Sequence, residues 1–92
     1  MYKIIKKQEL GQDTYLIEVE APKIARAALP GQFVIVKTDE QAERIPLTIS
    51  DTDLNDGTIA LVVKTIGYST RKMVTFDVGD FFKDVAGPLG RP

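Results

Sequence analysis

Residues 32–38 read QFVIVKT and residues 44–50 read RIPLTIS, two apolar runs separated by the polar stretch 39–43. The first run is apolar at four successive positions, 33–36, a pattern that predicts a central strand buried on both faces. The second run carries Pro46, a residue that strands accept at their first positions or at a bulge. Two short strands this close together are typical of an antiparallel β fold.

Other segments extend this pattern in both directions. Residues 2–9, 14–20, 58–66 and 81–85 are strand candidates, and the turn signals lie at 11–13 and 53–57. A short helix is expected within 21–29, ended by Pro30 and Gly31, and a second over 69–76, capped by Ser69 or Thr70. Many short strands with one or two small helices predict an all-β barrel or sandwich.

The composition limits the classes of function. The chain has 92 residues, a length typical of one domain, and a net charge of -1, which argues against a general nucleic-acid or anionic-membrane binder. The start, MYKIIKKQELG, has only a two-residue apolar patch between lysines, so neither a signal peptide nor a membrane span is expected there. A cytoplasmic location is the expectation.

Cysteine and histidine are both missing from the sequence. Their absence excludes a disulfide framework, a thiolate-held iron–sulfur cluster, a Cys/His zinc site and Ser-His or Cys-His catalysis within these residues. Asp51, Asp53 and Asp56 surround a turn, and the half of a calcium loop that they resemble has no glutamate at the twelfth position. No metal site is therefore expected.

Two elements are candidates for binding an anion. Arg44 at the start of a strand would hold a phosphate, while Thr48 offers a hydroxyl to a polar ligand edge. In the G-Y-S-T stretch, 67–70, a glycine break precedes hydroxyls at a helix start, where free N–H groups suit a phosphate. The plainer readings are a surface arginine and an ordinary helix cap, with Arg71 and Lys72 as solvated charges.

A third feature, GPLG at 87–90, predicts a tight chain reversal or a stiff terminus. Taken in order, RIPLTI (44–49), LVVKTIGYST (61–70), GDFF (79–82) and GPLGRP (87–92) resemble the flavin-binding barrel of the ferredoxin–NADP reductase superfamily. Within it, the chain looks most like small (alpha) subunits of NADH-dependent reduced ferredoxin:NADP oxidoreductase, also called sulfide dehydrogenase. Dihydroorotate dehydrogenase electron-transfer subunits are near relatives. The resemblance covers essentially the whole chain.

The resemblance implies a six-stranded antiparallel Greek-key β-barrel with one or two short helices that holds FAD along one side. It assigns Arg44 to the FAD pyrophosphate and Thr48, as the catalytic residue, to the flavin N5. Pro46 and Leu47 would line the flavin ring. The superfamily motif is Arg-x-Tyr-Ser/Thr, whereas this chain has Leu47 in place of the aromatic residue and its arginine one position further upstream.

The remaining assignments from the resemblance lie in the second motif. Val62, Val63 and Lys64 would sit beside the ribose and adenosine. Gly67, Ser69 and Thr70 would cradle the pyrophosphate at the helix start. FAD and FMN are not distinguished by these residues.

Members of this family continue past GPLG into a nucleotide-binding domain and a cysteine motif for a [2Fe–2S] cluster, whereas this sequence stops at Pro92. Residues 1–92 are therefore expected to be the FAD-binding fragment of an oxidoreductase that passes electrons between NAD(P)H and an iron–sulfur protein or partner subunit. Its expected partners are the NAD(P)-binding domain of the full-length chain and a larger subunit. Alone, it is expected to bind flavin weakly or not at all and to show little turnover.

Two functions from other classes stay open on the sequence. One is a small oligonucleotide-binding barrel, which would need a basic groove with stacked aromatic residues. The other is a protein-interaction module without flavin. A flavin spectrum that does not change on adding the protein, in the wild type and in Arg44→Ala alike, would favour these alternatives.

Overall fold

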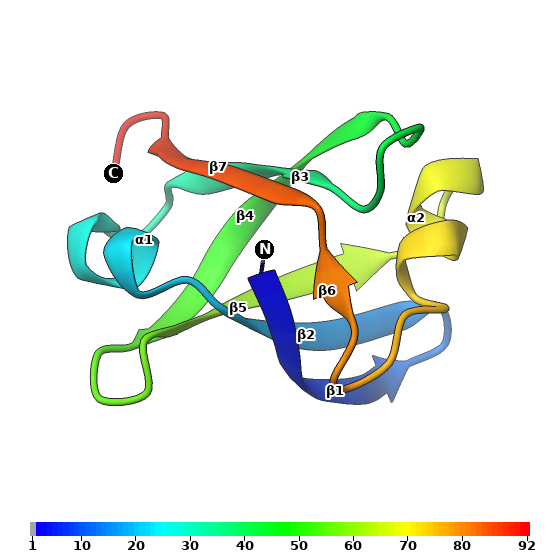
Figure 1. Cartoon of the computed structure of the whole chain (residues 1–92), viewed down its shortest axis with the longest axis horizontal. Helices are drawn as coiled ribbons and strands as arrows, with labels where there is room; N and C mark the ends of the chain where they lie inside the picture. The colour runs from blue at the N-terminus through cyan, green and yellow to red at the C-terminus, as the bar shows by residue number, and fades with distance from the viewer. Residues whose placement is uncertain (1) are drawn as a thin grey trace.

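The computed structural model describes residues 2–92, which form seven strands and two short helices (Figure 1). The elements are β1 (Tyr2–Gly11), β2 (Thr14–Glu20), α1 (Pro22–Ala27), β3 (Phe33–Lys37), β4 (Arg44–Asp53), β5 (Thr58–Lys64), α2 (Tyr68–Met73), β6 (Phe81–Phe82) and β7 (Asp84–Leu89). The mostly β architecture with short helices confirms the fold class predicted from the sequence. In this part of the chain, no helix has the length and apolar character needed to cross a membrane.

All seven strands belong to one antiparallel sheet, in the order β6-β1-β2-β5-β4-β3-β7. The run β2-β5-β4-β3 within it is a Greek key. The strands at the two ends of this order, β6 and β7, are separated in the chain only by Lys83, whose amide donates a hydrogen bond to the Thr38 carbonyl (3.1 Å). The sheet therefore curls into a nearly closed barrel, which leaves little open edge.

The strand count differs from the expected six because the last predicted strand, 81–85, divides at Lys83 and then continues to Leu89. GPLG is accordingly not the predicted chain reversal: Gly87 and Pro88 lie inside β7, which pairs with β3. A Cβ on Gly87 would lie 3.0 Å from Val34 Cγ1 and 3.1 Å from the Phe33 carbonyl oxygen. Glycine permits this close crossing of the two strands.

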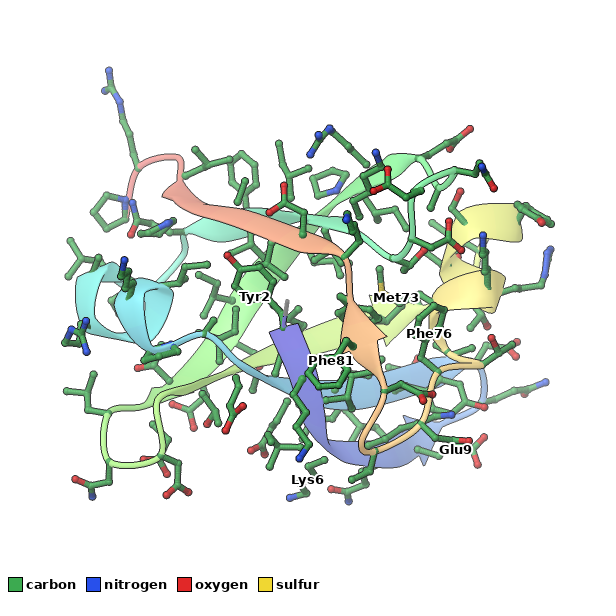
Figure 2. The ribbon with its side chains drawn as sticks, in the orientation of Figure 1. Tyr2, Lys6, Glu9, Met73, Phe76 and Phe81 are labelled. Atoms are coloured by element: carbon green, nitrogen blue, oxygen red, sulfur yellow. The ribbon has the colours of Figure 1, made fainter. Side chains whose placement is uncertain are left out.

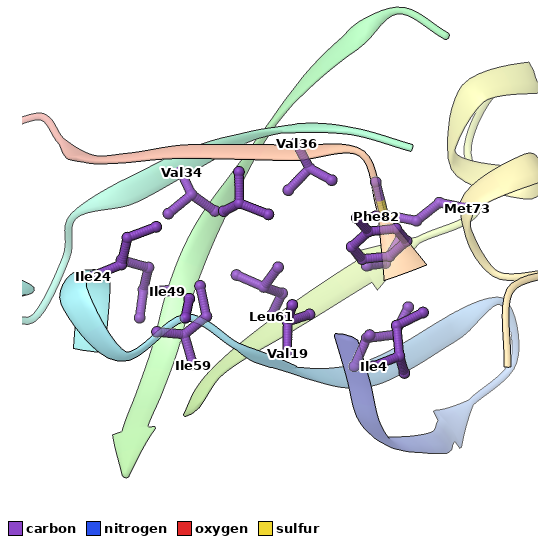
Figure 3. Packing of buried hydrophobic residues seen from close by; sticks show 14 of the residues in the cluster. Ile4, Val19, Ile24, Val34, Val36, Ile49, Ile59, Leu61, Met73 and Phe82 are labelled. Atoms are coloured by element: carbon purple, nitrogen blue, oxygen red, sulfur yellow. The ribbon is translucent and has the colours of Figure 1, made fainter. Parts of the chain in front are cut away.

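The core lies inside the barrel and is drawn from every wall (Figure 3). Its largest fully buried side chains are Phe82, Ile4, Ile17, Ile59, Leu61 and Met73. The central strand is β5, which is fourth of seven in the sheet order and buried at 58–61 and 63. The prediction that residues 32–38 are buried on both faces is wrong, because only Val34 and Val36 of β3 face the interior.

The two helices cover the barrel's openings. Ile24 and Ala25 of α1 are buried in the core. Met73 is the buried residue of α2, and Met73 and Phe76 extend from this region toward β6 (Figure 2), where the Phe76 and Phe82 ring centroids are 5.5 Å apart. These contacts hold the last residue of α2 and the segment after it against the core and β6.

Candidate functional site

A groove opens where strands β4 and β5 separate. Their cross-strand pairs run from Asp53↔Thr58 to Ile49↔Leu61, with a register shift between Ile49 and Asp51, and then stop. Beyond this point, residues 44–48 pair only with β3 and residues 62–64 only with β2. The groove has a volume of about 640 Å³, in the range of small-molecule sites. It is lined by Ile45, Pro46, Leu47, Thr48, Ser50, Val62, Lys64, Ile66 and Thr70.

Pro46 is tolerated at the third position of β4 because its nitrogen faces the groove, where no strand pairs with β4. The Ile49 amide donates to the Gln32 carbonyl (2.9 Å), so the pairs that exchange hydrogen bonds with β3 alternate from there along the ladder. Pro46, opposite Ile35, falls on a pair that exchanges none, and its missing N–H costs no bond to β3. By the same alternation, the backbone amide and carbonyl of Thr48 point away from β3, toward the groove.

The side chains of β4 approach the groove from two faces. Arg44, Pro46 and Thr48 are exposed on the outer face, whereas Ile45 and Leu47 pack against the core. Leu47 therefore borders the groove from the core side, and Thr48 from the solvent side. This wall combines an apolar base with a hydroxyl at its outer rim.

The opposite wall comes from β5 and the segment that follows it. Val62 is half-buried, Lys64 is exposed, and the Ile66 side chain is 83% exposed. Among the nine lining residues, Lys64 is the one with a charged side chain. Val63 is fully buried in the core, so any contact from this residue to a ligand would come from its backbone.

The start of α2 forms the end of this wall. Gly67 is the N-cap, so the prediction that Ser69 or Thr70 occupies this position is wrong. The Thr70 hydroxyl, at the third helical position, accepts from the amides of Ile66 and Gly67 (both 3.1 Å) and fixes the turn from inside the helix. Gly67 has an extended φ of -155°, and a Cβ there would meet nothing within 4 Å. The space beside Gly67 is therefore open to a ligand.

Two residues expected to bind the cofactor contact other side chains instead. Arg44 lies outside the groove lining, with Nη1 3.4 Å from Asp84 Oδ2. The Ser69 hydroxyl donates to Glu43 Oε2 (3.1 Å). The groove thus brings together six of the ten predicted site residues: Pro46, Leu47, Thr48, Val62, Lys64 and Thr70.

The sequence analysis missed three groove residues, Ile45, Ser50 and Ile66. Nothing in the sequence singles out Ser50, yet its hydroxyl donates to the Ala60 carbonyl (3.1 Å) at the bulge where the groove begins. Nothing local marks this role, since a bulge depends on how two distant strands pair. The signal for Ile66 was an apolar residue directly before a glycine break.

A second hollow lies beyond α2, against the loop between β3 and β4. It has a volume of about 400 Å³ and is lined by Thr38, Gln41, Ala42, Glu43, Tyr68, Ser69 and Lys72. Lys72 Nζ lies 2.6 Å from Asp39 Oδ2; this contact lowers the pKa of Asp39 and raises that of Lys72. The matching pair of Lys83 and Glu40, at 2.8 Å, lowers the pKa of Glu40 and raises that of Lys83.

The acidic turn at 53–57 does not form a metal site in residues 2–92. No three potential ligands from His, Cys, Asp and Glu come together there or elsewhere in this range. Asp53 Oδ1 instead accepts from the amides of Asn55 (2.9 Å) and Asp56 (3.0 Å). The Asp53 side chain thus stabilises the turn, as the sequence pattern indicated.

Known proteins match this chain over nearly its whole length. No protein-family model matches the chain. An uncharacterized protein from the adh 3' region of Clostridium beijerinckii is 48% identical over 92 residues, covering 100% of this chain and 31% of the relative. A homologue of the dihydroorotate dehydrogenase B (NAD(+)) electron transfer subunit from Thermotoga maritima is 39% identical over 89 residues, covering 97% of this chain and 32% of the relative.

Among solved structures, a chain of the NADH-dependent reduced ferredoxin-NADP oxidoreductase, studied for flavin-based electron bifurcation, superimposes with a TM-score of 0.96. The two chains are 38% identical, and the match covers 100% of this chain and 33% of the other. The chain therefore spans about a third of the length of the proteins it matches.

Proposed function

The chain belongs to the barrel domains of the ferredoxin–NADP reductase superfamily, and we propose on this basis that its groove binds the flavin of an electron-transfer oxidoreductase, with FAD as the cofactor. One observation carries the proposal: the six motif residues gathered in the groove come from two separate motifs, and their positions in the two motifs differ by 14 to 24. Their meeting at a strand separation creates a ligand-sized space with apolar walls.

The residues of the groove suit a flavin in shape and chemistry. Ligand sites combine mostly apolar walls with a few polar groups that fix orientation. Pro46, Leu47, Val62 and Ile66 supply apolar surface for the ring system. Thr48 presents a hydroxyl and a backbone edge at the rim, so that a donor is available to the flavin N5.

A bound flavin supplies hydride and one-electron chemistry, and the protein supplies position and electrostatics. In this proposal Thr48 would donate a hydrogen bond, through its hydroxyl or its amide, to N5 of the oxidised ring, where N5 is an acceptor. In a reduced ring N5 would instead carry N–H, and the Thr48 hydroxyl, unlike its amide, could rotate to accept from it. The apolar walls exclude water from the face of the ring.

The phosphates of FAD are proposed to lie at the α2 end of the groove. Lys64 is the cation in the groove, and the open space beside Gly67 lets a pyrophosphate approach the backbone closely. Thr70 holds that turn in place. Arg44 would join this site by exchanging its Asp84 partner for a phosphate, since a 3.4 Å pair between half-exposed side chains is weak.

The partners are also part of the proposal. Hydride exchange with NAD(P)H needs a nucleotide-binding domain, and such a domain would belong to the two thirds of the relatives' length that this chain does not span. A larger oxidoreductase subunit or an iron–sulfur protein would take or supply the electrons. With no cysteine, these 92 residues cannot themselves hold a [2Fe–2S] cluster by thiolates.

The groove does not favour the oligonucleotide alternative. Sequence-tolerant binding of single strands depends on a basic channel with stacked aromatic side chains. The groove is lined by one lysine and no aromatic residue, and the chain has a net charge of -1. A flavin-free interaction module remains the outcome if no flavin binds.

The test is a titration of the 92-residue chain with FAD, followed by the visible absorbance and fluorescence of the flavin. In the wild type, we expect a spectral shift that saturates with FAD. In Arg44→Ala, the FAD affinity should fall about tenfold or more, as expected for the loss of a charge-assisted phosphate contact. Arg26→Ala, on α1, is the matched control and should change nothing. An unshifted spectrum at millimolar FAD would contradict the proposal, and a parallel titration with FMN measures the share contributed by the adenylate half.

A further inference from the structure

The two walls of the groove are hydrogen-bonded to each other at one end only. At that end, the Ile49↔Leu61 pair and the Ser50 bond to Ala60 hold β4 against β5. Past this point each wall is anchored to a different neighbour, β3 on one side and β2 on the other. Without a second connection, the width at the α2 end would be set by these separate anchors alone.

Contacts between side chains connect the walls at the other end. Glu43, the residue before β4, accepts the Ser69 hydroxyl of α2 (3.1 Å), and Asp39 pairs with Lys72 of the same helix (2.6 Å). Both contacts join the loop 38–43, which leads into β4, to the helix that follows β5. Figure 1 shows this loop beside α2, at the side of the barrel where β5 ends.

The loop is itself held firmly, so it can act as a fixed support. Asp39 caps it through the Gln41 amide (3.0 Å), and the Ala42 amide donates to the Asp39 carbonyl (3.2 Å). Lys83 ties it to the junction of β6 and β7 through its own amide on Thr38 and its ammonium on Glu40. Because Met73 holds the other end of the helix in the core, the start of α2 is the part that moves if the contacts between the loop and the helix are lost.

We propose that the pairs Asp39–Lys72 and Glu43–Ser69 form a latch that sets the width of the groove and so positions the flavin without touching it. This inference rests on the proposed function for the identity of the ligand. It changes the role of Ser69, whose hydroxyl is engaged by Glu43, from a pyrophosphate ligand to a positioning residue. Thr70, one residue on, faces the groove, whereas Ser69 and Lys72 face the hollow on the loop side of the helix.

The chain offers a matched control for this latch. Glu40–Lys83 is an ion pair of the same kind, starting from the same loop, but it does not reach α2. Lys72→Met combined with Ser69→Ala removes the latch, and Lys83→Met removes the control pair. In both cases methionine keeps the aliphatic stem of the lysine.

Two measurements are made on the 92-residue chain. The first is amide hydrogen exchange without ligand: residues 66–74 should exchange several-fold faster in the latch variant than in the wild type or in Lys83→Met. The second is the FAD dissociation constant, which should rise about threefold to tenfold in the latch variant only, the range for losing two exposed polar contacts. Asp39→Asn, which keeps a side-chain oxygen for the Gln41 amide but removes the charge paired with Lys72, should weaken FAD binding about as much as Lys72→Met alone.

The outcomes separate the two proposals. If wild-type chain binds FAD and the latch variant matches Lys83→Met in both measurements, the latch is wrong while the flavin site stands. If no form binds FAD, the proposed function fails, and the exchange rates of 66–74 still decide whether the latch holds the helix. We expect the denaturant midpoints of the latch and control variants to change little and by equal amounts. This control is needed because a general loss of stability would by itself speed amide exchange and weaken FAD binding.

Discussion

Ile49 lies opposite Leu61, and this is the last pair that joins β4 to β5 before the strands separate into the groove. Leu61 is fully buried and Ile49 is 6% exposed. The pair therefore belongs to the core on its inner face and marks the closed end of the candidate flavin site. The change from core to binding site occurs within one residue of β5, because Val62, which follows the buried Leu61, lines the groove.

Truncating these neighbours should separate folding from binding. We expect Leu61→Ala to lower the free energy of unfolding by about 2–5 kcal/mol, because it leaves a cavity in a packed core. Val62→Ala, at a half-buried position, should cost less than half as much and instead weaken FAD binding. Chemical denaturation followed by circular dichroism checks the first change, and flavin titration the second. Equal destabilisation by both would argue against the separation.

Gly67→Ala should be tolerated when the protein folds but should weaken its binding of FAD. Its extended backbone and empty surroundings let Gly67→Ala fold without strain, while the added methyl group would occupy the space proposed for the pyrophosphate. We expect an unchanged or slightly lower melting temperature, because alanine is a poorer N-cap than glycine, and about tenfold weaker FAD binding, as for a displaced phosphate contact. Gly11→Ala is the control, since it too meets nothing within 4 Å and lies away from the groove. Unaltered FAD affinity in Gly67→Ala would place the phosphates elsewhere.

Asp84 should compete with the ligand for Arg44. Because Arg44 Nη1 lies 3.4 Å from Asp84 Oδ2, phosphate binding by the arginine requires this pair to open. Asp84→Asn removes the competing charge and is expected to tighten FAD binding about twofold to threefold, the small effect typical of an exposed pair. The gain should vanish when Arg44→Ala is also present, which a double-mutant cycle measures. A gain that survives without Arg44 would show that Asp84 acts through the general field.

The contact between Asp39 and Lys72 should be visible in the titration of the carboxyl group. The hydrogen bond from Lys72 lowers the pKa of Asp39 below its ordinary 3.8. A depressed pKa means that the contribution to stability is complete above about pH 3.8 and is lost as the pH falls through the lower, folded-state pKa. Carbon-detected NMR of the Asp39 carboxyl should show this shift, and Lys72→Met should bring the pKa back toward the ordinary value. In Lys83→Met, the same measurement should show an unchanged pKa for Asp39 and a higher pKa for Glu40 than in the wild type.

Thr70 should matter more to stability than its neighbour Ser69. The Thr70 hydroxyl accepts from two backbone amides at the start of α2, whereas Ser69 bonds only to the Glu43 side chain. We expect Thr70→Ala to lower the free energy of unfolding by about 1 kcal/mol, the usual cost of losing a helix cap. Ser69→Ala should change it by less than about 0.5 kcal/mol, as for most surface substitutions. Equal losses would mean that the two hydroxyls share the capping role.

Much of the fold follows from local features of the sequence. The hairpin at 11–13, the turn at 53–57 and the extent of β2 at 14–20 match the predictions. Asp13 and Gly57 adopt the positive φ values that these turns require, and the Asp53 side chain bonds to the turn backbone, so the signals are local. The helix boundaries shifted by one to three residues, since short helices depend on tertiary contacts for most of their stability. The predicted reversal at GPLG was wrong because pairing with β3, over fifty positions away in the chain, holds that segment extended.

The sequence by itself determined the class of the barrel, its family and the two motifs from which a flavin site is proposed. These depend on side-chain chemistry and on hydrophobic patterns that are local along the chain. Only the tertiary structure decided that β4 leaves β5 after Ile49, that Ser69 and Arg44 contact Glu43 and Asp84, and that Val63 turns into the core. The physical reason is that strand register and side-chain partners are set by pairing between distant segments, and a one-residue change in register sends each side chain to the opposite face.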